Sequence, residues 1–203
     1  TTNVVGTVNV LESLRTVPSA RVAVMITSDK CYANPGGDHA FVETDSLGGD
    51  DPYGGSKAAA ELAIAAFRAS YAQELPTVIS VRAGNVIGGG DWSKDRLVPD
   101  LIRAFSADRP AEIRMPGATR PWQFVMDALH GYLLAVERAW NGRVPSAINV
   151  GPPLAEIRTV GWFCDAMAEQ WGDGATWKEI RAEHPHRDAP TLALDATRAS
   201  ESL

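Results

Sequence analysis

The sequence predicts an α/β protein with a mostly parallel, doubly wound β-sheet. Short β-branched runs alternate with longer helical patterns through most of the 203 residues, which is typical of helices packed on such a sheet. The composition, with 45% hydrophobic and 22% charged residues, is that of an ordinary folded domain that can bury a sizeable core.

The first half of the chain shows this alternation most clearly. Apolar residues at three- and four-residue spacing predict amphipathic helix, and β-branched runs predict buried strands. Asp51 and Pro52 supply an N-cap and a first-turn proline for a long, alanine-rich helix. The elements predicted here are helices over 2–15 and 56–74 and strands over 22–26 and 77–81.

The second half alternates less regularly, and a smaller lobe is expected to begin near 84–96. The helices predicted here lie over 97–107, 126–140 and 160–171. The predicted strands lie near 111–115, 123–125, 147–150 and 176–180, and a final strand and helix start fall within 191–203.

Charge and cysteine content exclude several classes of function. A net charge of −6, without a cluster of Lys and Arg, argues against nucleic acid or an anionic membrane as the main partner. Cys31 and Cys164 are far apart and lack metal-ligand spacing, which favours a reducing cytoplasm. Because no apolar stretch approaches about 18 residues, we predict no membrane span.

Tyr53 and Lys57 are the first candidates for chemistry. Four residues apart, they share one face of the predicted helix. A nearby cation and the positive end of the helix both stabilise a phenolate, so Tyr53 is a candidate general base. A surface pair is the common alternative for this spacing. However, residues 27–30 directly follow the strand at 22–26, and ligands of parallel sheets collect at the carboxyl ends of strands.

Five stretches, taken in order, resemble a known family. They are 27–32 (TSDKCY), 51–62 (DPYGGSKAAAEL), 82–92 (RAGNVIGGGDW), 95–100 (DRLVPD) and 118–123 (ATRPWQ). Together they are similar to the extended short-chain dehydrogenase/reductases, also called NAD-dependent epimerases/dehydratases. Within that family they most resemble the CDP-glucose branch of the nucleotide-sugar 4,6-dehydratases.

The resemblance implies how the domains are organised. Residues 1–86 would form the second half of an NAD-binding Rossmann domain, and 87–203 mainly a smaller α+β nucleotide-sugar lobe, with 124–150 returning to the sheet. The family's glycine-rich NAD motif is not in this sequence; the loop at 84–92 does not open a helix after a first strand. We therefore expect a chain truncated at both ends, which alone binds NAD weakly or not at all.

The resemblance also implies a reaction in which NAD oxidises sugar carbon 4, water leaves across carbons 5 and 6, and hydride returns to carbon 6. Tyr53 would take the hydroxyl proton. Lys57 would assist it and bind the cofactor ribose. Ser28, which we favour over Thr27, would hold the carbon 4 oxygen.

Asp29 and Lys30 would carry out the elimination. Asp29 would be the acid for the departing hydroxyl, and Lys30 the base, at a position where dTDP-glucose dehydratases carry a glutamate. The lysine resembles the CDP-glucose branch, so the implied conversion is CDP-glucose to CDP-4-keto-6-deoxyglucose. A lysine base must lose its charge, which calls for burial or a cationic neighbour.

The remaining site residues are assigned on the same resemblance. The predicted cofactor contacts are Tyr53, Lys57, Thr27 and Arg82. The predicted substrate contacts are Thr27, Asn85, Arg96 and Arg120. The two arginines suit a diphosphate because guanidinium binds phosphate oxygens bidentately. No metal is predicted, since His184 and His186 lack a third ligand.

Three questions stay open. An epimerase or decarboxylase of the same family would share Tyr53 and Lys57 without needing the acid–base pair. A catalytically silent sugar-nucleotide-binding relative is a further alternative. Finally, the small, apolar face of the 56–74 helix predicts a homodimer.

Overall fold

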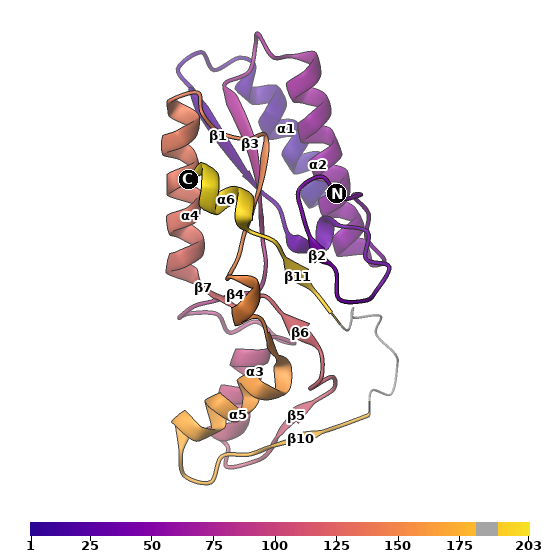
Figure 1. Ribbon diagram of the computed structural model, residues 1–203, viewed down its shortest axis with the longest axis vertical. Helices are drawn as coiled ribbons and strands as arrows, with labels where there is room; N and C mark the ends of the chain where they lie inside the picture. The colour runs from indigo at the N-terminus through magenta and orange to yellow at the C-terminus, as the bar shows by residue number, and fades with distance from the viewer. Residues whose placement is uncertain (182–190) are drawn as a thin grey trace.

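A computed structural model describes residues 1–181 and 191–203. The chain forms two bodies (Figure 1). The upper body holds the main sheet and most of the long helices. The lower body holds two helices and a two-stranded sheet. Residues that follow the main strands connect the two bodies.

The main sheet has three parallel strands in the order β1 (Val22–Ile26), β3 (Thr77–Ala83) and β8 (Ala147–Val150). The register pairs Val24 with Ile79 and Val81 with Ile148. Parallel neighbours need crossover connections, and α2 (Pro52–Ser70) supplies the one between β1 and β3. The parallel α/β fold predicted from the sequence is therefore present.

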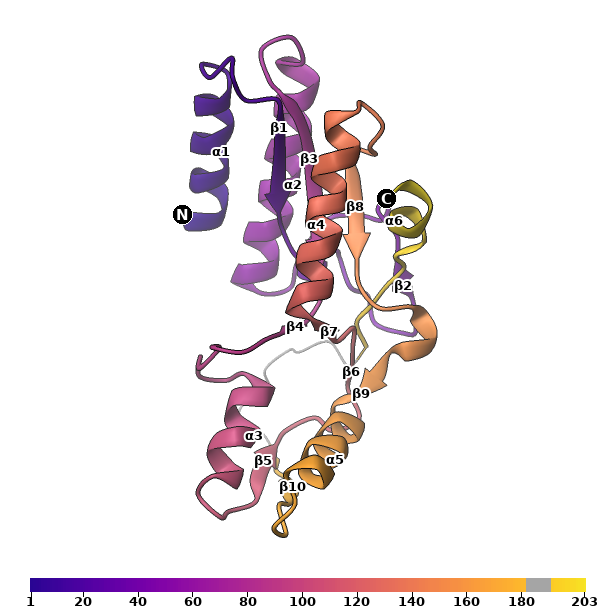
Figure 2. The same ribbon diagram turned by 90° about the vertical axis from the view of Figure 1, so that its left-hand side faces the viewer.

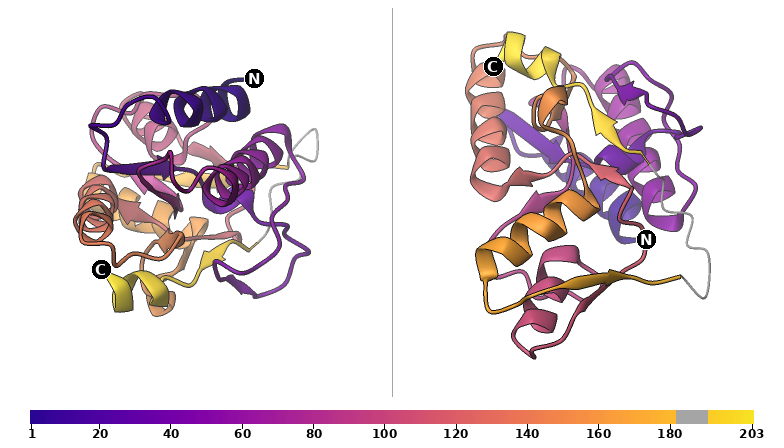
Figure 3. Two further views of the ribbon diagram at one scale, coloured as in Figure 1. Left: turned by 90° about the horizontal axis from the view of Figure 1, so that it is seen from above. Right: turned by 60° about the horizontal axis from the view of Figure 1, so that its bottom comes forward.

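Helices cover both faces of this sheet (Figures 2 and 3). On one face, α1 (Thr2–Leu14) and α2 enclose a core made by Leu11, Ile64 and Val78. On the other face, α4 (Val125–Trp140) packs on Ile79 and Ile148. Burial on both faces explains why most residues of the strands are apolar.

The helix α2 begins and ends earlier than the predicted 56–74. It begins at Pro52 because the Asp51 carboxylate accepts hydrogen bonds from the amides of Tyr53 and Gly54, at 2.8 and 2.9 Å. It ends at Ser70, well before the Leu75–Pro76 bond, where a proline disfavours helix in the preceding residue. The earlier start places Tyr53 inside the first turn.

The lower body is built from α3 (Leu97–Phe105), α5 (Val160–Trp171) and the parallel strands β5 (Ala111–Ile113) and β10 (Trp177–Glu179). Its core includes Leu101, Phe105, Ile113 and Cys164.

The remaining elements are short. They are η1 (Asp29–Cys31), β2 (Ala40–Phe41), β4 (Val86–Ile87), β6 (Thr119–Arg120), β7 (Gln123–Phe124), η2 (Leu154–Glu156), β9 (Arg158–Thr159), β11 (Ala193–Leu194) and α6 (Thr197–Ser202). Strand β11 pairs with β2, and α6 packs against β8. Residues 193–202 thus lie with the upper body, although the sequence assigned this end mainly to the lobe.

Within residues 1–181 and 191–203, none of the helices is both long and apolar enough to cross a bilayer. Nor does that part of the chain contain three or more His, Cys, Asp or Glu side chains grouped to hold a metal ion. His184 and His186 lie outside the described residues.

Candidate functional site

The candidate site lies at the carboxyl edge of the main sheet, where β1 ends. Ser28 and the single turn η1 follow this strand and pack against α2. A Cβ atom added to Gly54 would lie 2.7 Å from the carbonyl oxygen of Lys30, so only glycine permits this approach. The first turn of α2 and the segment 28–31, which we call the catalytic turn, are therefore in direct contact.

Lys57 contacts the end of β1 and lies beside Tyr53. The Lys57 ammonium donates to the carbonyl oxygen of Ile26 at 3.3 Å and lies 6.0 Å from the centre of the Tyr53 ring. Burial lowers the pKa of Lys57, while the nearby Glu61 carboxylate acts in the opposite direction. Tyr53 is 47% exposed. A partly buried ammonium thus stands beside an accessible phenol.

Ser28 and Asp29 form the buried part of the turn. The Ser28 hydroxyl donates to Asp29 Oδ1 at 2.9 Å and accepts from the amide of Lys30 at 3.2 Å. Asp29 is only 4% exposed, and burial raises its pKa to about 6, although Ser28, Lys30 and Arg120 all favour the carboxylate. Its Oδ2 atom has no hydrogen-bond partner among the described residues. Such a carboxyl group can carry a proton and deliver it as an acid.

Lys30 follows Asp29 in the same turn. Its side chain is exposed, so the described part of the chain does not bury it.

Asn85 lies in the loop after β3 and Arg120 lies in β6, and the segments around them are held together beside this edge. The carbonyl oxygen of Asn85 accepts from the amide of Gln123 at 2.9 Å. A Cβ on Gly84 would come within 2.5 Å of Pro121, so the two segments approach closely at a glycine. The charge of Arg120, the arginine predicted to bind the diphosphate, favours the carboxylate form of Asp29 in the turn.

Arg96 is placed differently. It is exposed and occupies the N-cap position of α3, in the lower body. The residues predicted for the site are therefore divided between the two bodies.

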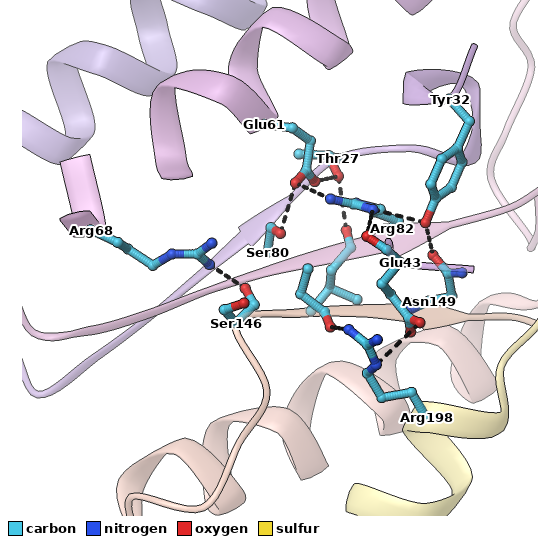
Figure 4. A network of polar contacts seen from close by, with 12 residues as sticks. Thr27, Tyr32, Glu43, Glu61, Arg68, Ser80, Arg82, Ser146, Asn149 and Arg198 are labelled. Carbon is cyan, nitrogen blue, oxygen red and sulfur yellow. Dashed lines mark hydrogen bonds and ion pairs between the residues drawn. The ribbon is translucent and has the colours of Figure 1, made fainter. Parts of the chain in front are cut away.

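Thr27 and Arg82 do not lie where a cofactor contact would be expected, because both side chains are buried in protein contacts (Figure 4). The Thr27 hydroxyl donates to Glu61. Arg82 donates to Glu61 at 2.8 Å, to the Tyr32 hydroxyl at 2.9 Å and to the carbonyl oxygen of Glu43 at 3.1 Å. The placement of these two residues does not support their predicted role as ligand contacts.

The sequence analysis missed Glu61, Tyr32 and Asn149, which complete this buried network. A usable signal was present, because Glu61 follows Lys57 by four residues and shares its helix face. No comparable spacing marks Tyr32 or Asn149.

The residues present fit only one part of an NAD molecule. An accessible phenol and a partly buried ammonium suit the hydroxyl groups of a ribose. The sequence has no glycine-rich turn between a first strand and a helix to hold the diphosphate. Tyr53 and Lys57 are thus the described residues whose chemistry suits a ribose of such a cofactor.

Known proteins resemble this chain over its whole length. CDP-glucose 4,6-dehydratase of Salmonella typhimurium is 42% identical over 210 residues, covering 100% of this chain and 58% of that protein. The chain therefore spans less than two thirds of this relative.

Two solved structures share the fold. DesIV, a dTDP-glucose 4,6-dehydratase from Streptomyces venezuelae with NAD bound, has a TM-score of 0.83 at 20% identity, covering 100% of this chain and 59% of its own. UDP-glucuronic acid 4-epimerase from Bacillus cereus, in complex with UDP-glucuronic acid and NAD, also has a TM-score of 0.83, at 19% identity, covering 99% of this chain and 60% of its own. A dehydratase and an epimerase thus match equally well, so the fold does not separate the two reactions.

A family model matches residues 1–151, which include the catalytic turn and the first turn of α2. This match covers well over half of the chain. The chain belongs to the NAD dependent epimerase/dehydratase family.

Proposed function

We propose that the full-length protein is an NAD-dependent nucleotide-sugar 4,6-dehydratase that converts CDP-glucose to CDP-4-keto-6-deoxyglucose. The observation that carries the proposal is a buried Asp29 carboxyl beside Lys30, in a turn pressed against the helix end that bears Tyr53 and Lys57. The 42% identity to a CDP-glucose 4,6-dehydratase supports the same reaction. An epimerase has no use for an acid and a base at this position.

The oxidation step uses the first turn of α2. Tyr53 accepts the proton of the carbon 4 hydroxyl, and the Lys57 ammonium stabilises the phenolate that receives it. The Ser28 hydroxyl holds the carbon 4 oxygen. Tyr53 and Lys57 would hold the ribose of NAD, which would supply the hydride acceptor for carbon 4 and the hydride donor for carbon 6, while carbon 5 would regain a proton from the protonated Lys30.

The elimination step uses the catalytic turn. The new ketone acidifies the hydrogen on carbon 5, and neutral Lys30 removes it as a proton. Asp29 gives its own proton to the departing carbon 6 hydroxyl, which leaves as water. Because Lys30 is exposed in the protein alone, we propose that the bound nucleotide sugar covers it and so favours its neutral form.

Arg120 and Asn85 are proposed to hold the nucleotide sugar. Arg120 would bind the diphosphate, and Asn85 would contact the sugar or diphosphate from the adjoining loop. Arg96 would add a second cation from the lower body. Thr27 and Arg82 are left out of this ligand set because their polar groups are buried in protein contacts.

The test is the product formed from CDP-glucose by the full-length protein, identified by NMR. We expect a 4-keto-6-deoxy sugar and no net change in the redox state of NAD. A 4-epimer of the sugar would contradict the dehydratase assignment and favour an epimerase.

Two further parts of the proposal concern assembly and location. Leu62 on α2 is 59% exposed, and we propose that this helix pairs with a second copy of the protein. A sedimentation mass of one subunit would contradict the homodimer. Two free, buried cysteines fit the reducing cytoplasm proposed as its compartment.

A further inference from the structure

The catalytic turn is held on both sides by buried hydroxyl groups (Figure 4). Thr27, immediately before Ser28, donates its hydroxyl proton to Glu61 Oε1. Tyr32, immediately after Cys31, accepts a hydrogen bond from Arg82 at 2.9 Å. The turn that carries Ser28 and Asp29 is thus attached to the protein at its two ends.

Both attachments lead to one buried ion pair. Arg82 on β3 and Glu61 on α2 lie 2.8 Å apart, with side chains only 6% and 3% exposed. Glu61 lies one helical turn after Lys57 and two turns after Tyr53, on the same helix. The pair therefore relates the catalytic turn to the helix that carries the general base.

The Tyr32 arm is fixed as well. The Tyr32 hydroxyl donates to Asn149 Oδ1 at 2.6 Å, and the Asn149 side chain donates to the carbonyl oxygen of Phe41 at 2.9 Å. Burial raises the pKa of Tyr32, so its hydroxyl stays protonated and able to donate. Together these hydrogen bonds hold the Tyr32 ring in one orientation.

We infer that Glu61 and Arg82 are positioning residues, which act through Thr27 and Tyr32 to hold Ser28 and Asp29 at a fixed place relative to Tyr53. This inference rests on the proposed function, in which Ser28 and Asp29 act on a sugar that Tyr53 deprotonates. It gives Thr27 and Arg82 a role in holding the turn, instead of a role in binding the cofactor or the substrate. Displacement of reacting groups by about 1 Å can cost about 100-fold in rate, so such a framework matters.

The experiment compares two substitutions that each remove one hydroxyl donor from Glu61. Thr27→Val removes the attachment of the turn. Ser80→Ala removes a buried donor at 2.9 Å on β3 and leaves the turn attached, so it is the matched control. Both are made in the full-length protein, together with Thr27→Ser, which keeps the hydroxyl.

With CDP-glucose as substrate, we expect Thr27→Val to lower kcat by about 10- to 100-fold while KM stays within about twofold. Thr27→Ser, which keeps the hydroxyl, should have a kcat much closer to that of the wild type. Ser80→Ala should keep kcat within about twofold. A raised KM with unchanged kcat in Thr27→Val would show a ligand contact and overturn the inference, as would an equal loss of kcat in Ser80→Ala.

A second readout needs no turnover. The Asp29 carboxyl, faced by Ser28, Lys30 and Arg120, should titrate near pH 6 by carbon-13 NMR, because burial raises its pKa to about 6. Ser80→Ala should leave this titration unchanged, and Thr27→Val should move it to lower pH as the turn loses its fixed, buried place. If the wild type does not act on CDP-glucose, the proposed function fails, and the titration alone decides. An unchanged Asp29 titration in Thr27→Val would then overturn the inference.

Discussion

The two sides of the catalytic turn differ in what satisfies their polar groups. Behind the turn, Glu61 and Arg82 are buried and bonded to one another and to Thr27 and Tyr32. In front of it, Tyr53 is 47% exposed, and Asp29 Oδ2 is buried without a hydrogen-bond partner in the described residues. The back is held by contacts within the chain, although Arg82 Nε has no hydrogen-bond partner among the described residues, whereas the front presents an accessible phenol to groups from outside. Loss of the buried ion pair should therefore change stability most, and loss of the accessible phenol should change chemistry most.

The largest expected effect lies in front. Tyr53→Phe removes the proposed general base, so kcat of the full-length protein on CDP-glucose should fall by about 100- to 10,000-fold. Stability should change little, because this side chain is half exposed. Tyr71→Phe, just beyond the other end of α2, is the control and should leave kcat within about twofold. Equal activity of both variants would remove Tyr53 from the mechanism.

The next effect lies behind the turn. Glu61→Gln leaves the Arg82 charge buried without its partner, so the free energy of unfolding in urea should fall by about 3–5 kcal/mol. Glu74→Gln breaks an ion pair of the same 2.8 Å length to Arg15, but its side chain is half exposed. That control should cost only about 0–1 kcal/mol. If Glu61→Gln and Glu74→Gln lowered the free energy of unfolding by similar amounts, burial would not make the Glu61–Arg82 pair more stabilising than the exposed pair.

A smaller effect connects the two sides through pH. The pKa of Asp29 rises from an ordinary 3.8 to about 6 on folding, because burial disfavours its charge. The folded state therefore binds more protons, and this group lowers stability as pH rises from about 4 through about 6. Asp29→Asn should abolish that loss, worth about 2–3 kcal/mol above pH 7. Urea unfolding at a series of pH values measures this change in the free energy of unfolding. Parallel curves of unfolding free energy against pH for Asp29→Asn and the wild type would contradict the prediction.

Sequence reasoning recovered the parts of the fold that rest on strong local patterns. The strands at 22–26 and 147–150 and the helix at 160–171 have the predicted bounds, because β-branched runs and apolar periodicity extend over their full length. The paired strands of two residues carry no periodicity and were mostly missed, as β4 and β6 were, although a strand was predicted near 123–125, where β7 lies. Their pairing depends on how the two bodies meet, which no short window contains.

The candidate site, like the fold, could be predicted from the sequence only in part. Tyr53 and Lys57 could be placed at the end of β1 because helix spacing and sheet topology both constrain them. Arg82 was assigned to the cofactor, since nothing local shows that its partner is a glutamate 21 residues away on another element. Charged residues can be read as functional or structural only when their partners are known.

The central claim is that the catalytic turn performs the elimination while the first turn of α2 performs the oxidation. Lys30→Met separates the two steps in a single turnover of the full-length protein with CDP-glucose that carries deuterium at carbon 5. The account predicts that reduced nicotinamide still forms and accumulates, and that the deuterium stays on the sugar. Release of the deuterium to solvent at the wild-type rate would contradict it.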